Sequence, residues 1–365
     1  MTHPARVPAT YEACRAAFRR AAERAGLPFE SHPISARGPR GEALTIDAAS
    51  LGAAAPGRAL VVLSGVHGVE GFIGSAVQCD LLGRLARSSL PADVAVLVVH
   101  GVNPWGMAWC RRQNESNVDM NRNWRRDEVA PAHNDAYDLL HALVCPSGPQ
   151  PPEVDRILAA ALDLVAVHGI TFVRDGITRG QYRHADGLHF GGDRTEESAR
   201  IVERVVRERL AGAERLLAID LHTGHGPRGA LTLLSDRPPG SAQDRFLRAL
   251  AGPGAVEATA SNPAATTGTK SGQIANGLAD LFGGATCFAT SAEIGTVPDE
   301  EQLTATVLEH WVHRFGDRTD PAHAEIVRRY RRCFAPDDAA WEESALAKGR
   351  ALLDAAIGAV AEWRG

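Results

Sequence analysis

Four continuous apolar runs constrain the fold of this chain more than any other feature. None approaches the length of a membrane span, and none alternates apolar with polar residues as a strand with one solvated face does. Uninterrupted runs of this length are typical of strands in a parallel or mixed sheet that is covered on both faces. They occupy residues 58–65, 93–101, 215–224 and 285–296.

Helical patterns lie before, between and after these runs. The first predicted helix spans residues 11–25, with Thr10 as its N-cap and Gly26 just past its end. Residues 42–48 alternate like a half-exposed strand. Further helices are predicted at residues 71–87, 134–144, 153–167, 194–210, 300–315, 322–333 and 338–363.

Strands that alternate with helices predict an α/β fold, a three-layer α/β/α sandwich with a mixed, largely parallel central sheet. A chain of 365 residues fits one large domain of this kind or two small ones, and we expect one. We expect an N-terminal helix and edge strand over about residues 1–57, a catalytic core over about 58–300, and C-terminal helices over about 300–365. Ligands of open α/β sheets bind beyond the carboxyl ends of the strands.

Composition argues against several classes of function. The net charge is −5, and no basic run suggests a nucleic-acid partner. The N-terminus has no apolar segment of the kind a signal peptide needs, and no membrane partner is expected. Six scattered cysteines without a CxxC pair indicate reduced thiols, so we expect a cytoplasmic protein. Whether it forms a homo-oligomer stays open.

His67 and Glu70 come directly after the first apolar run, within "GVHGVEG". Their spacing lets both side chains reach one point from a tight turn, and the flanking glycines permit that turn. Imidazole and carboxylate are standard zinc ligands. The alternative is a glycine-rich turn with a surface carboxylate, which so short a pattern favours when it stands alone.

His222 and Glu293 lie at the ends of two other apolar runs. His222 alone is equally well explained as a core histidine bonded to a backbone carbonyl. Asp220 alternates with it and is placed to orient it, while His225 is a competing ligand or a loop residue. For Glu293 the alternative is a salt bridge to an arginine, since a buried carboxylate needs a partner or a function.

Three protein ligands with one open position are typical of a catalytic zinc site. His67, Glu70 and His222 supply such a set for one Zn²⁺ ion, which activates water and polarises a carbonyl. Glu293 fits the base that moves the proton to a leaving nitrogen. Zinc is preferred over Mn²⁺ or Co²⁺ because two nitrogens and one carboxylate suit it.

The segment 103–124, "NPWGMAWCRRQNESNVDMNRNW", lies between the ligands. Arg122 beside Asn121 can bind a carboxylate by paired hydrogen bonds. Another arginine near the metal, Arg111 or Arg112, can stabilise an oxyanion. The alternative is a charged surface loop.

Taken in order, these motifs resemble the zinc metallocarboxypeptidase superfamily, as an uncharacterised bacterial branch of it, over roughly residues 58–300. The resemblance implies the zinc carboxypeptidase fold and the same ligands, His67, Glu70 and His222, with Glu293 as general base. It implies that Arg112 polarises the scissile carbonyl, and that Asn121 and Arg122 grip a substrate carboxylate. It further implies that Asp119 orients His67.

The chain departs from the superfamily in one respect. No tyrosine lies between His222 and Glu293, where many carboxypeptidases carry a mobile one. Two glycine-rich polar segments, 180–192 and 266–273, are candidate lids or ordinary surface loops. The second contains Lys270, which could receive an acidic group.

We expect a zinc hydrolase that cleaves an amide bond beside a free carboxylate, in a short peptide or an N-acyl amino acid. One alternative is the aspartoacylase and succinylglutamate desuccinylase branch, which removes acyl groups from amino acids. A second alternative, of another class, is a catalytically silent zinc protein that binds carboxylates or peptide ends. A nucleotide-binding protein is disfavoured because "GVHGVEG" lacks the GxGxxG spacing.

Overall fold

The computed structural model describes residues 7–128, 133–259 and 270–363, and its centre is one eight-stranded sheet. The strand order is β1-β2-β4-β3-β5-β8-β6-β7. The pairs β3–β4, β3–β5, β5–β8 and β6–β7 are parallel, and the other pairs are antiparallel. The strands are β1 (Phe29–Arg37), β2 (Ala43–Gly52), β3 (Arg58–Ser64), β4 (Val94–His100), β5 (Arg215–Gly224), β6 (Leu231–Ser235), β7 (Val256–Ala258) and β8 (Thr286–Gly295).

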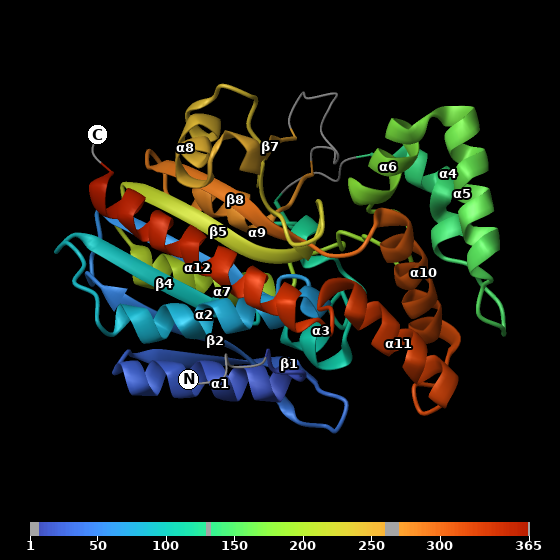
Figure 1. Ribbon diagram of the computed structural model, residues 1–365, viewed down its shortest axis with the longest axis horizontal. Coiled ribbons are helices and arrows are strands. Elements are labelled where there is room, and N and C mark those ends of the chain that lie inside the picture. Colours follow the sequence, from blue (N-terminus) through green and yellow to red (C-terminus); the bar gives the residue numbers. More distant parts are fainter. Residues whose placement is uncertain (1–6, 129–132, 260–269, 364–365) are drawn as a thin grey trace.

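Helices cover both faces of the sheet, which confirms the predicted α/β sandwich (Figure 1). On one face, α2 and α12 pack on β3, β4 and β5, and α1 packs on α2. On the other face lie α7 and α9. The helices are α1 (Tyr11–Ala25), α2 (Gly71–Leu85), α3 (Pro104–Trp109), α4 (Asp135–Val144), α5 (Val154–His168), α6 (Ile170–Thr178), α7 (Glu197–Leu210), α8 (Ala242–Ala251), α9 (Ile274–Gly277), α10 (Asp299–Phe315), α11 (Pro321–Phe334) and α12 (Ala339–Glu362).

The four apolar runs form the four adjacent strands β4, β3, β5 and β8, which confirms the central prediction. The predicted helices are present, with ends within three residues of those expected. Thr10 caps α1 by accepting a hydrogen bond from the backbone N–H of Ala13, and Gly26 adopts the left-handed conformation that ends it. All six cysteines are free thiols.

The predicted half-exposed strand was wrong about exposure. In β2, residues 44–49 are all buried, although polar residues alternate with apolar ones. The strand lies between β1 and β4, and Tyr11 of α1 donates a hydrogen bond from its hydroxyl to the backbone oxygen of Thr45. The buried carboxylate of Asp47 has a partner, because Arg15 Nε lies 3.1 Å from its Oδ2.

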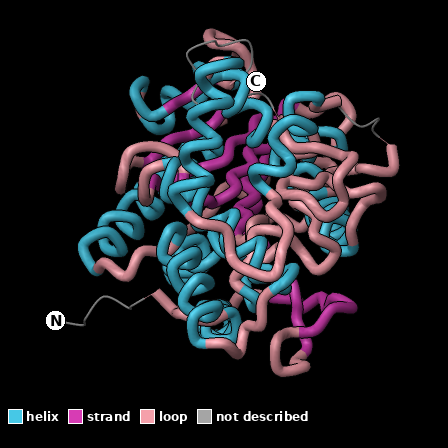
Figure 2. Tube along the Cα trace, turned by 90° about the vertical axis from the view of Figure 1, so that its right-hand side faces the viewer, coloured by secondary structure: helices cyan, strands magenta, loops and turns pink. Residues whose placement is uncertain are grey.

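Helices α4, α5 and α6 lie together beside α10, away from the sheet (Figure 1). Figure 2 looks onto this end of the molecule, where loops as well as helices lie in front of the strands. A small apolar cluster joins the group to α10 through Tyr137, Ile157 and Val307. Within the described ranges, no single helix has the length and apolar character of a membrane span, and only the bent pair α5–α6 reaches that threshold, as a pair.

Candidate functional site

The turn that carries His67 and Glu70 is shaped by two glycines. Strand β3 ends at Ser64, Gly65 adopts a positive φ of 69°, and a 3₁₀ turn at Gly68–Glu70 leads directly into α2. A Cβ on Gly68 would lie 2.0 Å from the backbone carbon of Gly106 in α3. The backbones of the turn and of α3 are therefore in contact. This contact fixes the backbone positions of His67 and Glu70.

Gly68→Ala should displace this turn. The added methyl group cannot be accommodated without moving backbone, so we expect a loss of stability of about 1–3 kcal/mol together with weaker metal binding. Urea unfolding and zinc titration measure the two effects. Gly83→Ala is the matched control in α2, because nothing lies within 4 Å of a Cβ there. Equal behaviour of the two variants would contradict the prediction.

His222 and Glu293 are neighbours on parallel strands. They are register partners in β5 and β8, and each lies two residues before the last residue of its strand. Register partners on adjacent strands project to the same face of the sheet. The two residues therefore stand side by side at the carboxyl edge of the sheet, where the sequence predicted the site.

The three predicted metal ligands converge on one point. His67 Nδ1 lies 2.9 Å from Glu70 Oε1, and His222 Nδ1 lies 2.7 Å from Glu70 Oε2. One ligand atom from each residue lies within 4.8 Å of the others, and all three side chains are buried. The surface-turn alternative for Glu70 is wrong, since the residue is 3% exposed.

Each histidine is held by an aspartate through its other nitrogen. His67 Nε2 lies 3.0 Å from Asp119 Oδ1, and His222 Nε2 lies 2.5 Å from Asp220 Oδ2. An Asp that accepts from Nε2–H leaves Nδ1 as the lone-pair nitrogen, which is how metal-binding histidines are usually oriented. His67 Nδ1 is buried and, although Glu70 Oε1 lies 2.9 Å away, the two atoms are not aligned for a hydrogen bond. The donor set therefore fits a zinc ion.

The local charges keep Glu70 ionised. Burial alone would raise the pKa of its carboxyl, but His67 and His222 outweigh burial and hold that pKa well below its usual range. Asp119 behaves in the same way, because Arg112 and His67 outweigh its burial. Both carboxylates are therefore available as anions at neutral pH.

Arg112 lies inside the cluster. Its Nη1 donates to Glu70 Oε1 at 2.8 Å, and its Nε donates to Asp119 Oδ2 at 3.1 Å. Nη2 makes no hydrogen bond among the described residues. Arg111, which the sequence left as the other candidate, points elsewhere and pairs with buried Glu309. The segment is thus not a surface loop.

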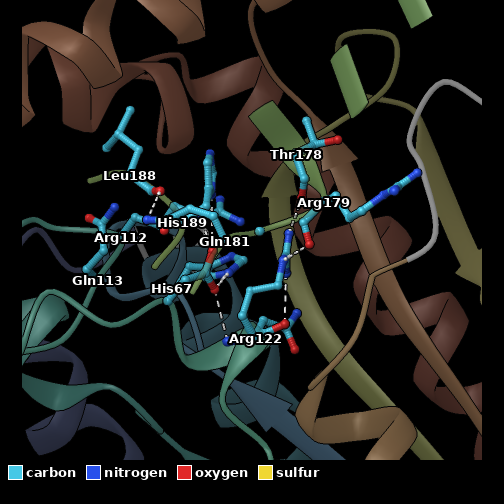
Figure 3. A network of polar contacts seen from close by, with 12 residues as sticks. His67, Arg112, Gln113, Arg122, Thr178, Arg179, Gln181, Leu188 and His189 are labelled. Atoms are coloured by element: carbon cyan, nitrogen blue, oxygen red, sulfur yellow. Dashed lines mark hydrogen bonds and ion pairs between the residues drawn. The ribbon is translucent and has the colours of Figure 1, made fainter. Parts of the chain in front are cut away.

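Asn121 and Arg122 are buried beside the cluster, and both are bonded to the chain itself. The Arg122 guanidinium donates to the carbonyl oxygens of Thr178, Arg179 and Asn121 (Figure 3). The side-chain oxygen of Asn121 accepts from the backbone N–H of Ile274 at 3.1 Å. A guanidinium has five N–H groups, so these contacts leave two of its donors for a ligand.

Glu293 has no ion pair or hydrogen bond at Oε2, which is buried, among the described residues. The predicted salt-bridge alternative is therefore absent there.

Lys270 is close enough to Glu293, Arg112 and Arg122 for their charges to shift its pKa. Burial and the arginines lower its pKa to about 8, against the opposing effect of Glu293. His225 instead bonds Glu257 at 3.2 Å and is outside the ligand set. Residues 266–269 of the second candidate lid lie outside the described ranges.

Sequence reasoning missed His189 as a site residue. It lies in the first candidate lid, segment 180–192, and its Nδ1 is 3.2 Å from Asp119 Oδ2. Its backbone φ of 55° is uncommon for a residue other than glycine and is often found at functional sites. Burial lowers its pKa to about 4, so the ring is neutral at pH 7. The glycine-rich composition of segment 180–192 was the one sequence signal that pointed to His189.

Comparisons with known proteins give the following matches. Similar solved structures include the metallo-carboxypeptidase of Burkholderia cenocepacia (14% identity, TM-score 0.48, covering 95% of this chain and 68% of that one) and that of Pseudomonas aeruginosa (15%, 0.46, 95% and 68%). A third is the succinylglutamate desuccinylase of Chromobacterium violaceum (16%, 0.39, 88% and 74%). No curated protein matches the sequence. The family described as "Protein of unknown function (DUF2817)" matches residues 8–348, and the chain therefore belongs to that family.

Proposed function

We propose that the protein is a zinc-dependent hydrolase that cleaves an amide bond next to a free carboxylate, in a short peptide or an N-acyl amino acid. The observation that carries the proposal is the buried cluster of His67, Glu70 and His222, whose two imidazoles are each oriented by an aspartate. A zinc ion held by these three residues would lower the pKa of water and polarise a carbonyl.

Glu293 is the proposed base. Its Oε2 is buried without a hydrogen bond to any described residue and stands beside His222 in the sheet, so we infer that it takes a proton from water. The same carboxyl then gives that proton to the leaving nitrogen. A carboxylate already tied into an ion pair would be less able to do this, which is why the missing partner supports the assignment.

The arginines divide two tasks in this proposal. Arg112 offers its Nη2, for which the described residues provide no acceptor, to the developing oxyanion, while Glu70 and Asp119 hold the rest of the guanidinium in place. Arg122 and Asn121 bind the substrate carboxylate through the N–H groups that their bonds to the chain leave over. The three carbonyl contacts would then serve to fix the guanidinium plane.

A second candidate is deacylation of an N-acyl amino acid whose acyl group carries its own carboxylate. Lys270 favours it, because this third cation lies near Arg112 and Arg122 and gives the site more positive charge than one carboxylate needs. Comparing hydrolysis of acidic acyl-amino acids, neutral acyl-amino acids, dipeptides and longer peptides separates the two candidates.

Metal removal is the direct test. We expect the purified protein to bind one zinc ion per chain, and chelation to abolish amide hydrolysis until zinc is added back. His222→Ala should lose the metal, whereas His225→Ala should keep it, since His225 lies outside the ligand set. Metal analysis and turnover measure the two effects. Full activity in the chelated protein, or metal retention by His222→Ala, would sink the proposal.

A further inference from the structure

Exposed large apolar side chains gather on one part of the surface. Within the described ranges five are prominent, and four of them lie on α4, α5 and the start of α6. Exposed fractions reach 68% for Leu162, 75% for Val167 and 64% for Ile170. Exposed apolar side chains that gather on neighbouring helices can mark an interaction site. Figure 1 shows α5 at the outer edge of the molecule.

Helix α5 is apolar on its outer as well as its inner face. It has fifteen residues, most of them alanine, leucine, isoleucine or valine, yet only Ile157 is buried. Four exposed residues, Asp155, Ala159, Leu162 and Ala166, recur at spacings of four, three and four. This is the a/d spacing of a helix that packs against another helix. We name these four residues the α5 stripe.

We propose that the α5 stripe pairs with the α5 stripe of a second copy, antiparallel and about a two-fold axis. In the register that places Ala159 opposite Leu162 of the second copy, the small residue leaves room for the large one. In the same register, Asp155 lies opposite Ala166 at each end of the stripe. Antiparallel pairing also sets the positive N-terminal end of each helix beside the negative C-terminal end of its mate.

Charge complementarity supports this occupant. Arg156 and Asp163 lie seven residues apart and flank the α5 stripe on the same side. In the proposed register, Arg156 is two residues, about 3 Å along the axis, from the position of Asp163 in the second copy. Symmetry provides the contact twice. Arg156 now pairs with Glu153 at 2.9 Å, but both side chains are highly exposed, so exchanging that pair has little energetic effect.

A membrane surface fits the same residues less well. Amphipathic helices that lie on anionic membranes carry lysine and arginine beside the apolar face. The exposed acidic and basic residues of α5 are Asp155 and Asp163 against a single arginine. A helix of fifteen residues is about 22 Å long, so pairing buries less than the roughly 800 Å² per partner of a standard interface. The expected dimer is therefore weak and depends on concentration.

Sedimentation and light scattering of the full chain over a wide concentration range test the proposal. The average mass should rise from monomer toward dimer, and Leu162→Glu should hold the protein monomeric. Arg156→Asp and Asp163→Arg should each raise the dissociation constant about tenfold, and the double variant should restore it. Phe315→Ala is the matched control, being an exposed apolar residue on α10.

Three results would overturn the inference. They are a monomeric wild-type protein at every concentration, unchanged association in Leu162→Glu, and a double charge variant as weak as the single ones. Binding to vesicles of phosphatidylserine and phosphatidylcholine that Leu162→Glu abolishes, without any dimer, would assign the surface to a membrane and also overturn it. Thermal melts confirm that each variant is folded. None of these measurements depends on the proposed reaction.

Discussion

Glu293→Gln should lower kcat by about 10²–10⁴-fold while zinc content and affinity stay unchanged. Glutamine keeps the shape of the side chain but cannot accept the proton from water. Glu293 is not among the three residues whose ligand atoms converge, so the metal site should survive the change. A fall in kcat with unchanged zinc binding would distinguish a residue that transfers protons from a residue that binds the metal.

Glu257→Gln provides the comparison for that experiment. Glu257 is a carboxylate in β7 that bonds His225, and it lies outside the ligand set. Its variant should lose far less turnover than Glu293→Gln. A Glu293→Gln protein that binds zinc and turns over at the wild-type rate would remove the base assignment and leave the metal site standing. Loss of zinc from that variant would instead make Glu293 a ligand.

Much of the sheet could be predicted because its central strands are apolar on both faces. Residues 58–64 and 94–100 need no information from elsewhere in the chain to be recognised as buried strands. The edge strands offered no such pattern. In β1, "FESHPISAR", only Ile34 is buried, and Pro33 lacks the backbone N–H that a ladder hydrogen bond needs. The short strands β6 and β7, of five and three residues, and helices α3, α6, α8 and α9 were also not predicted.

The candidate site was predictable where residues stand at strand ends. His67 and His222 are 155 positions apart in sequence, yet both follow from the rule that ligands gather at the carboxyl edge. Contacts made by loops did not follow from it. No pattern in segment 180–192 indicates that His189 contacts Asp119. Equally, nothing in the sequence at Thr178 and Arg179 indicates that their backbone oxygens accept hydrogen bonds from Arg122. These contacts join residues that are 56 to 70 positions apart in the chain, so they depend on the tertiary packing of the loops and not on a local pattern.

Asp119→Ala is expected to have the largest effect on stability of any single change near the site. Asp119 is fully buried and contacts His67, Arg112 and His189, and it also accepts from the backbone N–H of Asn121. Removing one partner of a buried ion pair is strongly destabilising, and here the Nε of Arg112 would lose its acceptor, with Glu70 left as the one carboxylate that pairs with the guanidinium. We expect the free energy of unfolding to fall by about 3–5 kcal/mol, and zinc affinity to fall about 10–100-fold.

The control is an aspartate–arginine pair of the same type at the surface. Asp93 binds Arg58 through both carboxylate oxygens, but its side chain is 54% exposed. Solvent screens such a pair, and Arg58 keeps its hydrogen bonds to the backbone oxygens of Val360 and Ala361, so Asp93→Ala should change stability little. Urea unfolding of the two variants at pH 7 makes the comparison. Equal losses would show that burial of Asp119 does not decide its contribution.

The contribution of Asp119 should also depend on pH in a defined direction. Burial acts to raise the pKa of its carboxyl, but Arg112, His67 and Arg122 outweigh burial and hold it well below the ordinary value of 3.8. A folded pKa below the unfolded one means that the stabilisation is complete above about pH 5 and is lost as pH falls below the unfolded value. The difference in the free energy of unfolding between the wild type and Asp119→Asn should therefore shrink when unfolding is measured below pH 3.8. Leu81→Ala is the control, because it removes only apolar packing, and its difference from the wild type should not shrink. A difference for Asp119→Asn that stays constant over this range would mean that the carboxylate charge is not what stabilises the fold there.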